Sequence, residues 1–213
     1  MRIFKNLTFI TSVLGLVFFL TGCMAHTARL ARPNNVYQLT RIDGAPKIIL
    51  TDLRDTRADK KSIGQVSALI LKSDVDINVA LTDRIAAKLR DTGFNVQKVN
   101  LSSKPGTKKI VELLKSDNGI LYVSGNLSKF FISSFDAVME AAKGNTIFSI
   151  FVYDNTGAML FSKTFTSHSE NWIGITGGFG ADKSIDIALE SSIDELFKNR
   201  EFKQIISENL KNN

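Results

Sequence analysis

The N-terminal segment constrains this chain more than any other part, because a segment that directs export sets the compartment in which the rest must fold. Arg2 and Lys5 precede a mostly apolar run from Leu7 to Leu20. This charged-then-apolar order is typical of a signal peptide. The run is shorter than the roughly 20 residues that a helix needs to cross a bilayer, and no second apolar run of that length follows. We therefore expect an exported chain without a transmembrane helix.

The apolar run ends in Leu20, Thr21, Gly22 and Cys23. These four residues resemble a lipobox, the cleavage and lipidation motif of bacterial lipoproteins. The resemblance implies cleavage between Gly22 and Cys23 and a covalent lipid, including palmitate, on the Cys23 thiol. Several acyl chains on one residue anchor a protein more firmly than a single chain, at about 0.8 kcal/mol per buried methylene. The alternative is an ordinary secretory peptide with an incidental cysteine at this place.

The residue after the cysteine bears on the membrane to which the protein is sorted. Met24 follows Cys23, whereas in the lipoprotein family an Asp there is the usual signal for retention in the inner membrane. The family resemblance thus implies a lipid-anchored protein of the bacterial outer membrane that faces the periplasm, although exposure at the cell surface stays open. No cofactor is expected beyond the covalent lipid.

Composition and cysteine content bound the folded part. Cys23 is the only cysteine, so an exported domain that uses it for lipid has none left for a disulfide and must be stabilised by its core alone. An apolar content of 44% with fifteen Phe residues is sufficient for such a core. Cleavage lowers the formal charge from +6 to +4, because it removes Arg2 and Lys5 but no acid. The remaining basic residues are scattered, which is typical of a solubilising surface and does not favour a nucleic-acid partner.

Three segments are expected along the chain. Residues 1–22 form the signal peptide, residues 23–46 a lipidated N-terminus with a flexible tether, and residues 47–213 a single globular periplasmic domain. The tether is expected because Pro33 and Pro46, two of the three prolines, lie in a stretch without a sustained hydrophobic period.

Helices are predicted where apolar residues recur at helical spacing. They recur every four residues from Ile77 to Leu89, between a capping Asp76 and a terminating Gly93. The same reasoning predicts a shorter helix from Thr107 and one or two amphipathic turns over 202–210. The clearest apolar stripe lies on 182–198 and predicts a helix packed on a sheet.

Strands are predicted from apolar bursts and alternation. The expected segments are 47–52, 66–71, 94–99, 119–135, 146–153 and 158–166. The segment 146–153 is largely apolar on both faces, which favours a central strand, and Asp154 to Gly157 predict a tight turn into its antiparallel partner. Together these elements predict an α+β domain with a mixed, mainly antiparallel sheet covered by helices on one face.

Several segments resemble one family. They are AAKLRDTGFNV (Ala86 to Val96), DKSIDIALESSIDELFKNREFKQII (Asp182 to Ile206), and, between them, GILYVSGNLSKFF and the hairpin NTIFSIFVYDNTGAMLFSKTF. With the lipobox, they resemble the YajG-type uncharacterised lipoproteins of proteobacteria over most of the mature chain. The resemblance implies an outer-membrane or periplasmic lipoprotein of unsettled role and transfers no catalytic residue. The auxiliary lipoproteins of lipid-transporting ABC systems share a similar helix-to-strand start.

A glycine-rich segment precedes the predicted helix over 182–198. Its spacing from Gly177 to Ser184 fits a P-loop, but Asp182 stands where glycine should approach the phosphates, and its carboxylate would repel them. A flexible connection before the helix explains the glycines more simply. The functional alternative is a rim that contacts a partner or ligand, formed by Trp172, Gly177, Gly178 and Phe179.

Two further groups of residues are weighed as sites. His168 has Ser167, Ser169 and Glu170 as neighbours, but neighbours on a strand point to alternate faces and do not form a catalytic triad. We expect a structural or solvated His168. With only one other histidine, at position 26, a metal site is not expected.

Acidic and basic residues alternate after the first predicted strand. The acids Asp52, Asp55 and Asp59 interleave with Arg54 and Arg57. Carboxylates suit hard cations, but the basic side chains more simply neutralise the acids.

These observations favour a non-enzymatic lipoprotein of the cell envelope. We expect it to bind or help assemble an envelope component through a sheet edge or the rim near Trp172. The alternative is an accessory lipoprotein of a lipid or lipopolysaccharide transport system, for which an apolar groove would be the structural sign. An enzyme that uses His168 ranks last. The expected partners are the lipid bilayer, through acylated Cys23, and an envelope protein or lipid.

Overall fold

The computed structural model describes residues 25–28, 44–66, 69–101, 105–134, 141–172 and 178–211. These residues form nine strands of one sheet and four helices. In chain order the elements are β1 (Ala25–Ala28), β2 (Lys47–Thr51), β3 (Arg54–Asp55), β4 (Gly64–Val66), β5 (Leu69–Ser73), α2 (Ile77–Asp91), β6 (Asn95–Val99), α3 (Thr107–Asp117), β7 (Gly119–Ser134), β8 (Ala141–Asp154), β9 (Met159–Trp172), α4 (Gly178–Lys198) and α5 (Arg200–Lys211).

Strand β7 organises the sheet, because its two edges have different partners. Along one edge it pairs in parallel with β2, then with β3 and finally with β4. Strand β6 runs parallel to β2 on its other side. Beyond β4, the antiparallel β5 and the parallel β1 complete this end of the sheet.

Along its other edge, β7 begins a long antiparallel arrangement with β8 and β9. The β7 pairing extends from Leu121 opposite Asp154 to Ser133 opposite Lys143. Asp154 closes the turn into β9, because its Oδ1 accepts hydrogen bonds from the backbone N–H groups two and four residues later, each at 2.9 Å. Gly157 has the positive φ of +83° that the turn requires. The predicted turn and the predicted α+β class with a mixed sheet are confirmed.

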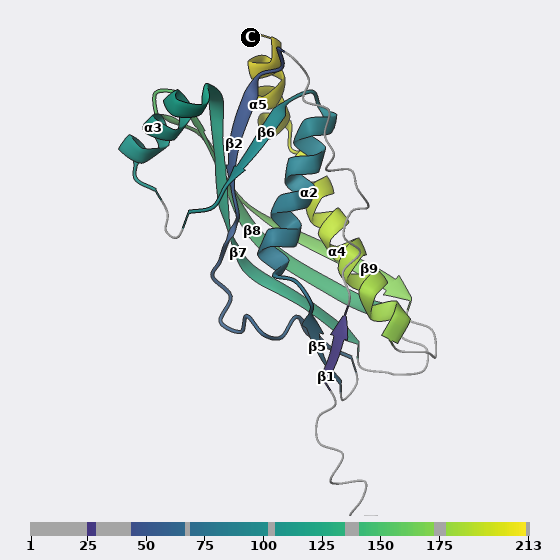
Figure 1. The fold of residues 1–213 in the computed structure, drawn as a ribbon. Helices are drawn as coiled ribbons and strands as arrows, with labels where there is room; N and C mark the ends of the chain where they lie inside the picture. The colour runs from purple at the N-terminus through teal and green to yellow at the C-terminus, as the bar shows by residue number, and fades with distance from the viewer. Residues whose placement is uncertain are drawn as a thin grey trace, which may run out of the picture.

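The main core lies between one face of the sheet and helices α2, α4 and α5 (Figure 1). The predicted apolar stripe of α4 packs against β9 and β8. Its residues Ile185, Leu189 and Leu196 have no exposed surface. The predicted helix that ends before Gly93 is α2, whose last turn is followed by that glycine at a φ of +105°. The predicted final turns are a complete helix of twelve residues, α5.

Helix α3 differs from the expected arrangement, because it covers the opposite face of the sheet (Figure 1). Its Ile110 and Leu114 pack on Ile49 and Tyr122, whereas Ile48, the neighbour of Ile49, belongs to the main core. Adjacent side chains of a strand point to opposite faces, so β2 is buried on both. Helices α2, α4 and α5 cover one face of the sheet, as expected, whereas α3 covers part of the other face.

Four residues before Lys47 contribute a strand to the sheet. Residues Ala25–Ala28, predicted to belong to the tether, form the strand β1, which pairs with β5. The predicted sites Gly22 and Cys23 and most of the predicted tether lie outside the described residues. Within the described part of the chain, none of the helices is both long and apolar enough to cross a membrane.

Candidate functional site

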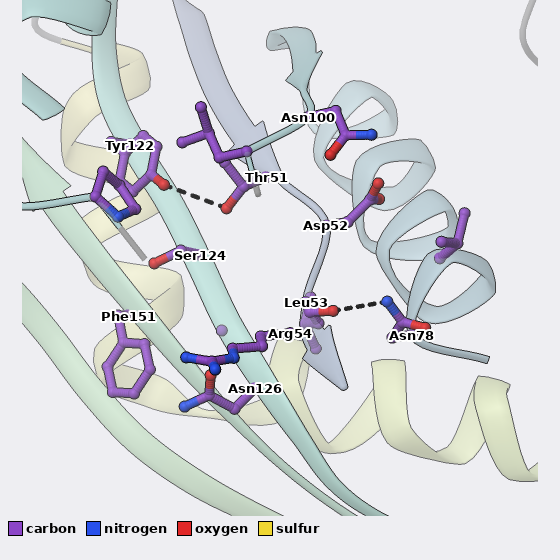
Figure 2. A pocket seen from close by; sticks show the side chains of 14 residues that line it. Thr51, Asp52, Leu53, Arg54, Asn78, Asn100, Tyr122, Ser124, Asn126 and Phe151 are labelled. Carbon is purple, nitrogen blue, oxygen red and sulfur yellow. Dashed lines mark hydrogen bonds between the residues drawn. The ribbon is translucent and has the colours of Figure 1, made fainter. Parts of the chain in front are cut away.

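A hollow of about 250 Å³, lined by polar and apolar residues, lies at the carboxyl ends of β2 and β6 (Figure 2). It exists because β2 ends at Thr51 while β7 continues beside it. In open sheets with parallel strands, ligands bind beyond the carboxyl ends of the strands. We call it the strand-end pocket. It is lined by Thr51, Asp52, Leu53, Arg54, Asn78, Val79, Asn100, Leu101, Pro105, Tyr122, Ser124, Gly125, Asn126 and Phe151.

One wall of the pocket is the face of β7 that carries Tyr122, Ser124 and Asn126 at every second position. Phe151 lies opposite Ser124 on β8 and adds an aromatic ring to the same wall. The hydroxyl of Tyr122 lies 3.3 Å from Oγ1 of Thr51. Burial raises the pKa of Tyr122 and outweighs the hydrogen bonds to Thr51 and Ser124, which lower it. The phenol is therefore neutral at physiological pH and can donate or accept a hydrogen bond.

The other wall is the loop after β2, which helix α2 holds in place. The backbone N–H of Leu53 donates to Oγ1 of Thr82 at 2.9 Å, and Nδ2 of Asn78 donates to the carbonyl of Leu53 at 2.8 Å. Leu53 itself has no exposed surface. Because the backbone and side chain of Leu53 are both fixed, the backbone at the adjacent Asp52 and Arg54 has a defined position.

Asp52 and Arg54 have different electrostatic surroundings. Asp52 forms an ion pair with Nζ of Lys98 at 2.9 Å, and Lys98 also contacts Asp83 on α2. Burial lowers the pKa of Lys98, but the hydrogen bonds and charges of the two acids outweigh it and raise that pKa. The negative charge of Asp52 is therefore compensated away from Arg54.

Arg54 lies exposed at the mouth of the pocket, opposite Asn126 in the register of β3 and β7. Figure 2 shows its guanidinium beside the Asn126 side chain. Within the described part of the chain, this guanidinium has no ion pair or side-chain hydrogen bond. A guanidinium offers several N–H donors in a plane that matches a carboxylate or phosphate. The pocket thus has an uncompensated cation at its entrance.

The alternating acids and bases after β2 do not converge on one point. Arg57 neutralises Asp55, as expected, with its Nη2 at 2.8 Å from Oδ2 and its Nε at 3.0 Å from Oδ1. Partial burial raises the pKa of Asp55, but the hydrogen bonds and charge of Arg57 outweigh it and lower that pKa. Asp59 instead accepts hydrogen bonds from the backbone N–H groups of Lys61 and Ser62. Across the described ranges, no three acidic, His or Cys side chains gather as metal ligands would.

The surroundings of His168 agree with the expected alternation of the strand. Ser167 is buried and donates to the hydroxyl of Ser191 on α4 at 2.8 Å, whereas His168 is exposed on the other face of β9. The Ser191 hydroxyl donates to the carbonyl of His168, not to its imidazole. Ser167 and His168 are therefore not brought together.

The predicted rim is only partly placed. Trp172 is the last residue of β9 and pairs with Ala141, and Gly178 and Phe179 begin α4. Gly177 lies outside the described residues. The rim stays a prediction.

A second hollow lies at the end of the molecule where α2, α4 and α5 meet. It has a volume of about 750 Å³ and an apolar floor formed by Phe197, Phe202, Ile206 and Leu210. We call it the α5 groove. It has the apolar character expected of the alternative function. Its other lining residues are Lys88, Thr92, Asp194, Lys198, Arg200, Lys203, Gln204 and Ser207.

Sequence reasoning missed the strand-end pocket. The polar residues after two predicted strands, Arg54 after the first and Asn100 after the third, are the signal that could have indicated it, because carboxyl ends of parallel strands lie at one edge. Parallel pairing of those strands was not predicted. Without it, there was no reason to place Tyr122 beside Thr51 or Asn126 beside Arg54.

Comparisons with known proteins give similar folds only. No protein-family model matches the chain, and no curated protein matches it. Among solved structures, a DUF330 protein from Xanthomonas campestris is 11% identical, with 90% of this chain and 99% of that chain covered and a TM-score of 0.49. The PelC dodecamer from Paraburkholderia phytofirmans is 13% identical over 69% and 85%, with a TM-score of 0.43. The lipoprotein GNA1162 from Neisseria meningitidis is 10% identical over 59% and 84%, with a TM-score of 0.37. At these identities and TM-scores the comparisons indicate no ligand, so a ligand must be inferred from the residues that line the pocket.

Proposed function

We propose that this chain is a membrane-anchored lipoprotein of the bacterial cell envelope that binds an anionic envelope component in the strand-end pocket without transforming it. The anchor is the lipid on Cys23, the membrane is the outer membrane, and the domain faces the periplasm. The lipobox residues from Leu20 to Cys23 support the anchor, and Met24 in place of an Asp after Cys23 supports the outer membrane. No cofactor other than that lipid is proposed.

The observation that supports a binding role is the uncompensated guanidinium of Arg54 at the mouth of a preformed hollow. The loop that positions Arg54 is fixed by the hydrogen bonds from Leu53 to Thr82 and from Asn78 to Leu53. A loop whose backbone is ordered before the ligand arrives loses less conformational entropy on binding. A cation carried on such a loop, beside polar groups, is therefore suited to recognise an anion.

The lining of the pocket narrows the class of ligand. Asn100, Ser124 and Asn126 provide donors and acceptors for hydroxyl groups, and Phe151 provides an apolar surface. The volume of about 250 Å³ lies just below the range of roughly 300–1,000 Å³ for drug-sized ligands. We propose a carboxylate or phosphate borne on one sugar-sized polar group, rather than a long chain.

The binding proposal is tested with the full lipidated protein in nanodiscs of zwitterionic lipid. Saturation-transfer NMR would compare glucuronate, glucose 1-phosphate and uncharged glucose as probes. We expect the two anions to receive saturation and glucose to receive much less. The Arg54→Gln variant should weaken anion binding by about tenfold or more and reduce the anion signals accordingly, because a charged hydrogen bond of about 1.5–3 kcal/mol is lost.

The matched control for this experiment is Lys72→Gln, which removes one exposed positive charge from β5, outside the pocket lining. Its signals should equal those of the wild type. Equal signals from all three probes, or equal losses in the two variants, would contradict recognition of an anion by Arg54.

The anchor is tested separately by Cys23→Ala. The wild type should sediment with outer membranes, whereas the variant should lose the lipid and appear in a soluble or differently processed form. Mass spectrometry of the N-terminal peptide checks acylation directly. A wild-type protein without acyl mass would contradict the proposed anchor.

A second candidate function is that of an accessory lipoprotein in a lipid or lipopolysaccharide transport system. The α5 groove favours it, because an apolar floor is what an acyl chain requires. In cells, cross-linking followed by pull-down of the tagged protein would test it. Stoichiometric recovery of a transporter subunit would support the candidate, and recovery of none would count against it.

A further inference from the structure

Helix α5 is amphipathic, and only part of its apolar side is covered by the protein. Phe202 and Ile206 belong to the main core, whereas Ile205 and Leu210 are partly buried at its border. Leu210, together with Phe202, Ile206 and Phe197 at the end of α4, forms the floor of the α5 groove. An apolar floor of this kind, in a hollow of about 750 Å³, lies within the size range of ligand sites.

The rim of the α5 groove is strongly basic. It contains Lys88, Lys198, Arg200 and Lys203 against a single acid, Asp194. Oδ2 of Asp194 lies 3.8 Å from Nζ of Lys198, and the two form an exposed ion pair on α4. The other three cations have no ion pair within the described part of the chain. The rim therefore has an excess positive charge directly beside apolar surface.

An apolar floor with a cationic rim matches a molecule that has an apolar chain and an anionic head. We propose that the α5 groove binds an anionic lipid, with one acyl chain against Phe197 and Leu210 and the head group against Arg200 and Lys203. Basic residues near an anionic lipid attract its head group electrostatically. Their long side chains can extend along apolar surface while the charge stays at the edge.

The bound lipid is a separate molecule and not the acyl group of the same chain. Figure 1 shows β1 and α5 at opposite ends of the domain. Cys23 precedes Ala25 by two residues, and two residues span at most about 7 Å. The covalent anchor therefore lies at the end of the domain away from the groove. This inference concerns a different site from the strand-end pocket and does not depend on the ligand proposed there.

The proposal is tested by photo-cross-linking the full lipidated protein in outer membranes with a diazirine analogue of palmitic acid. Tryptic peptides with the cross-link are identified by mass spectrometry. We expect the label on peptides from the end of α4 and from α5. A diazirine analogue of the corresponding fatty alcohol should label these peptides several-fold less, because it lacks the anionic head.

The double variant Arg200→Glu with Lys203→Glu should reduce labelling of these peptides by about tenfold or more. The matched control is Lys108→Glu with Lys115→Glu, two exposed charges on α3 on the opposite face of the sheet, and it should label like the wild type. Circular dichroism of each variant separates loss of binding from loss of fold. Arg54→Gln should also label like the wild type, which separates this site from the strand-end pocket.

Three results would overturn the proposal. They are label spread evenly over the chain, equal labelling by the acid and the alcohol, and equal labelling of the two charge-reversed variants. If the double variant is unfolded, Leu210→Ser, at the border of the groove, replaces it. Unchanged labelling in a folded Leu210→Ser protein would then count against the groove as the acyl site.

Discussion

The parallel and antiparallel parts of the sheet differ in how they are covered. Strand β2, in the parallel part, has helices on both faces, and its consecutive residues Ile48, Ile49 and Leu50 are all fully buried. Strand β8, in the antiparallel part, has helices on one face, and its burial alternates from residue to residue. Parallel strands tend to be buried on both faces, whereas antiparallel strands can leave one face to solvent. One sheet of this protein combines both arrangements.

The two arrangements meet along β7, and the strand-end pocket lies where they meet. Near Tyr122, β7 is a buried neighbour of β2, but at Asn126 its partner is the short strand β3. The face that α3 covers at Tyr122 is therefore open a few residues later. The strand-end pocket lies at this point, where the partner of β7 changes from β2 to β3.

The largest expected effect tests the covered face of the antiparallel part. Phe148 has no exposed surface and stacks on Phe165 with ring centroids 5.2 Å apart. Phe148→Ala should lower the free energy of unfolding by about 3–5 kcal/mol, as measured by urea titration. The matched control is Phe151→Ala on the opposite, partly open face, which should cost no more than about 1.5 kcal/mol. Equal losses in the free energy of unfolding would show that the antiparallel part is buried on both faces.

The parallel part should lack this asymmetry. Ile48→Ala and Ile49→Ala truncate adjacent residues that are fully buried on opposite faces of β2. Each should lower the free energy of unfolding by about 2–5 kcal/mol, as determined by the same titration. A nearly neutral Ile49→Ala would mean that α3 does not cover its face in solution.

A smaller, pH-dependent effect tests β3, the short strand that follows β2 as the partner of β7. Because the pKa of Asp55 is lowered by Arg57, folding is stabilised above the unfolded pKa of about 3.9, and this contribution is lost as pH falls through the lower, folded pKa. Asp55→Asn should destabilise the protein by about 1.5–3 kcal/mol near neutral pH. Urea titrations at several pH values should show the difference from wild type shrinking at acidic pH. A difference that stays constant down to about pH 2 would contradict the ion pair's role.

The smallest effect concerns the open face of the antiparallel part. The hydroxyls of Ser149 and Thr164 lie 2.8 Å apart across β8 and β9. Thr164→Ala should lower the free energy of unfolding by about 0.2–1 kcal/mol, the range for cross-strand pairs. The control is Thr166→Ala, two residues along the same exposed face. It should lower the free energy of unfolding by less than Thr164→Ala does. A loss of several kcal/mol at Thr164 would indicate that this face is covered in solution.

Sequence patterns predicted the elements that depend on neighbours in the chain. Helix α2 was expected from its four-residue spacing and from Gly93, and the hairpin turn from Asp154 to Gly157. These signals are local, because capping, positive φ and periodicity involve residues within one or two turns. The same reasoning gave too short a hairpin, since β8 and β9 continue to Ala141 and Trp172. Backbone pairing extends them beyond the apolar alternation.

The candidate site depends on contacts that local patterns do not contain. Thr51 and Tyr122, which meet at the pocket, are separated by 71 positions. Their contact follows from the parallel pairing of β2 with β7, and pairing register is decided by the whole sheet. The split of the segment around 66–71 into β4 and β5 was missed for a similar reason, because β4 is placed by β7.

The position of β1 bears on how far the domain could move from a membrane to which the proposed lipid on Cys23 attaches it. A flexible chain over residues 23–46 would give a root-mean-square reach of about 27 Å. Because Ala25 already belongs to the sheet, the free leash from Cys23 is only two residues, or at most about 7 Å. Under the proposed lipid anchor at Cys23, so short a connection would hold the domain close to the bilayer surface and restrict its rotation. A binding partner would then have to come to the membrane, because the domain could not extend to it.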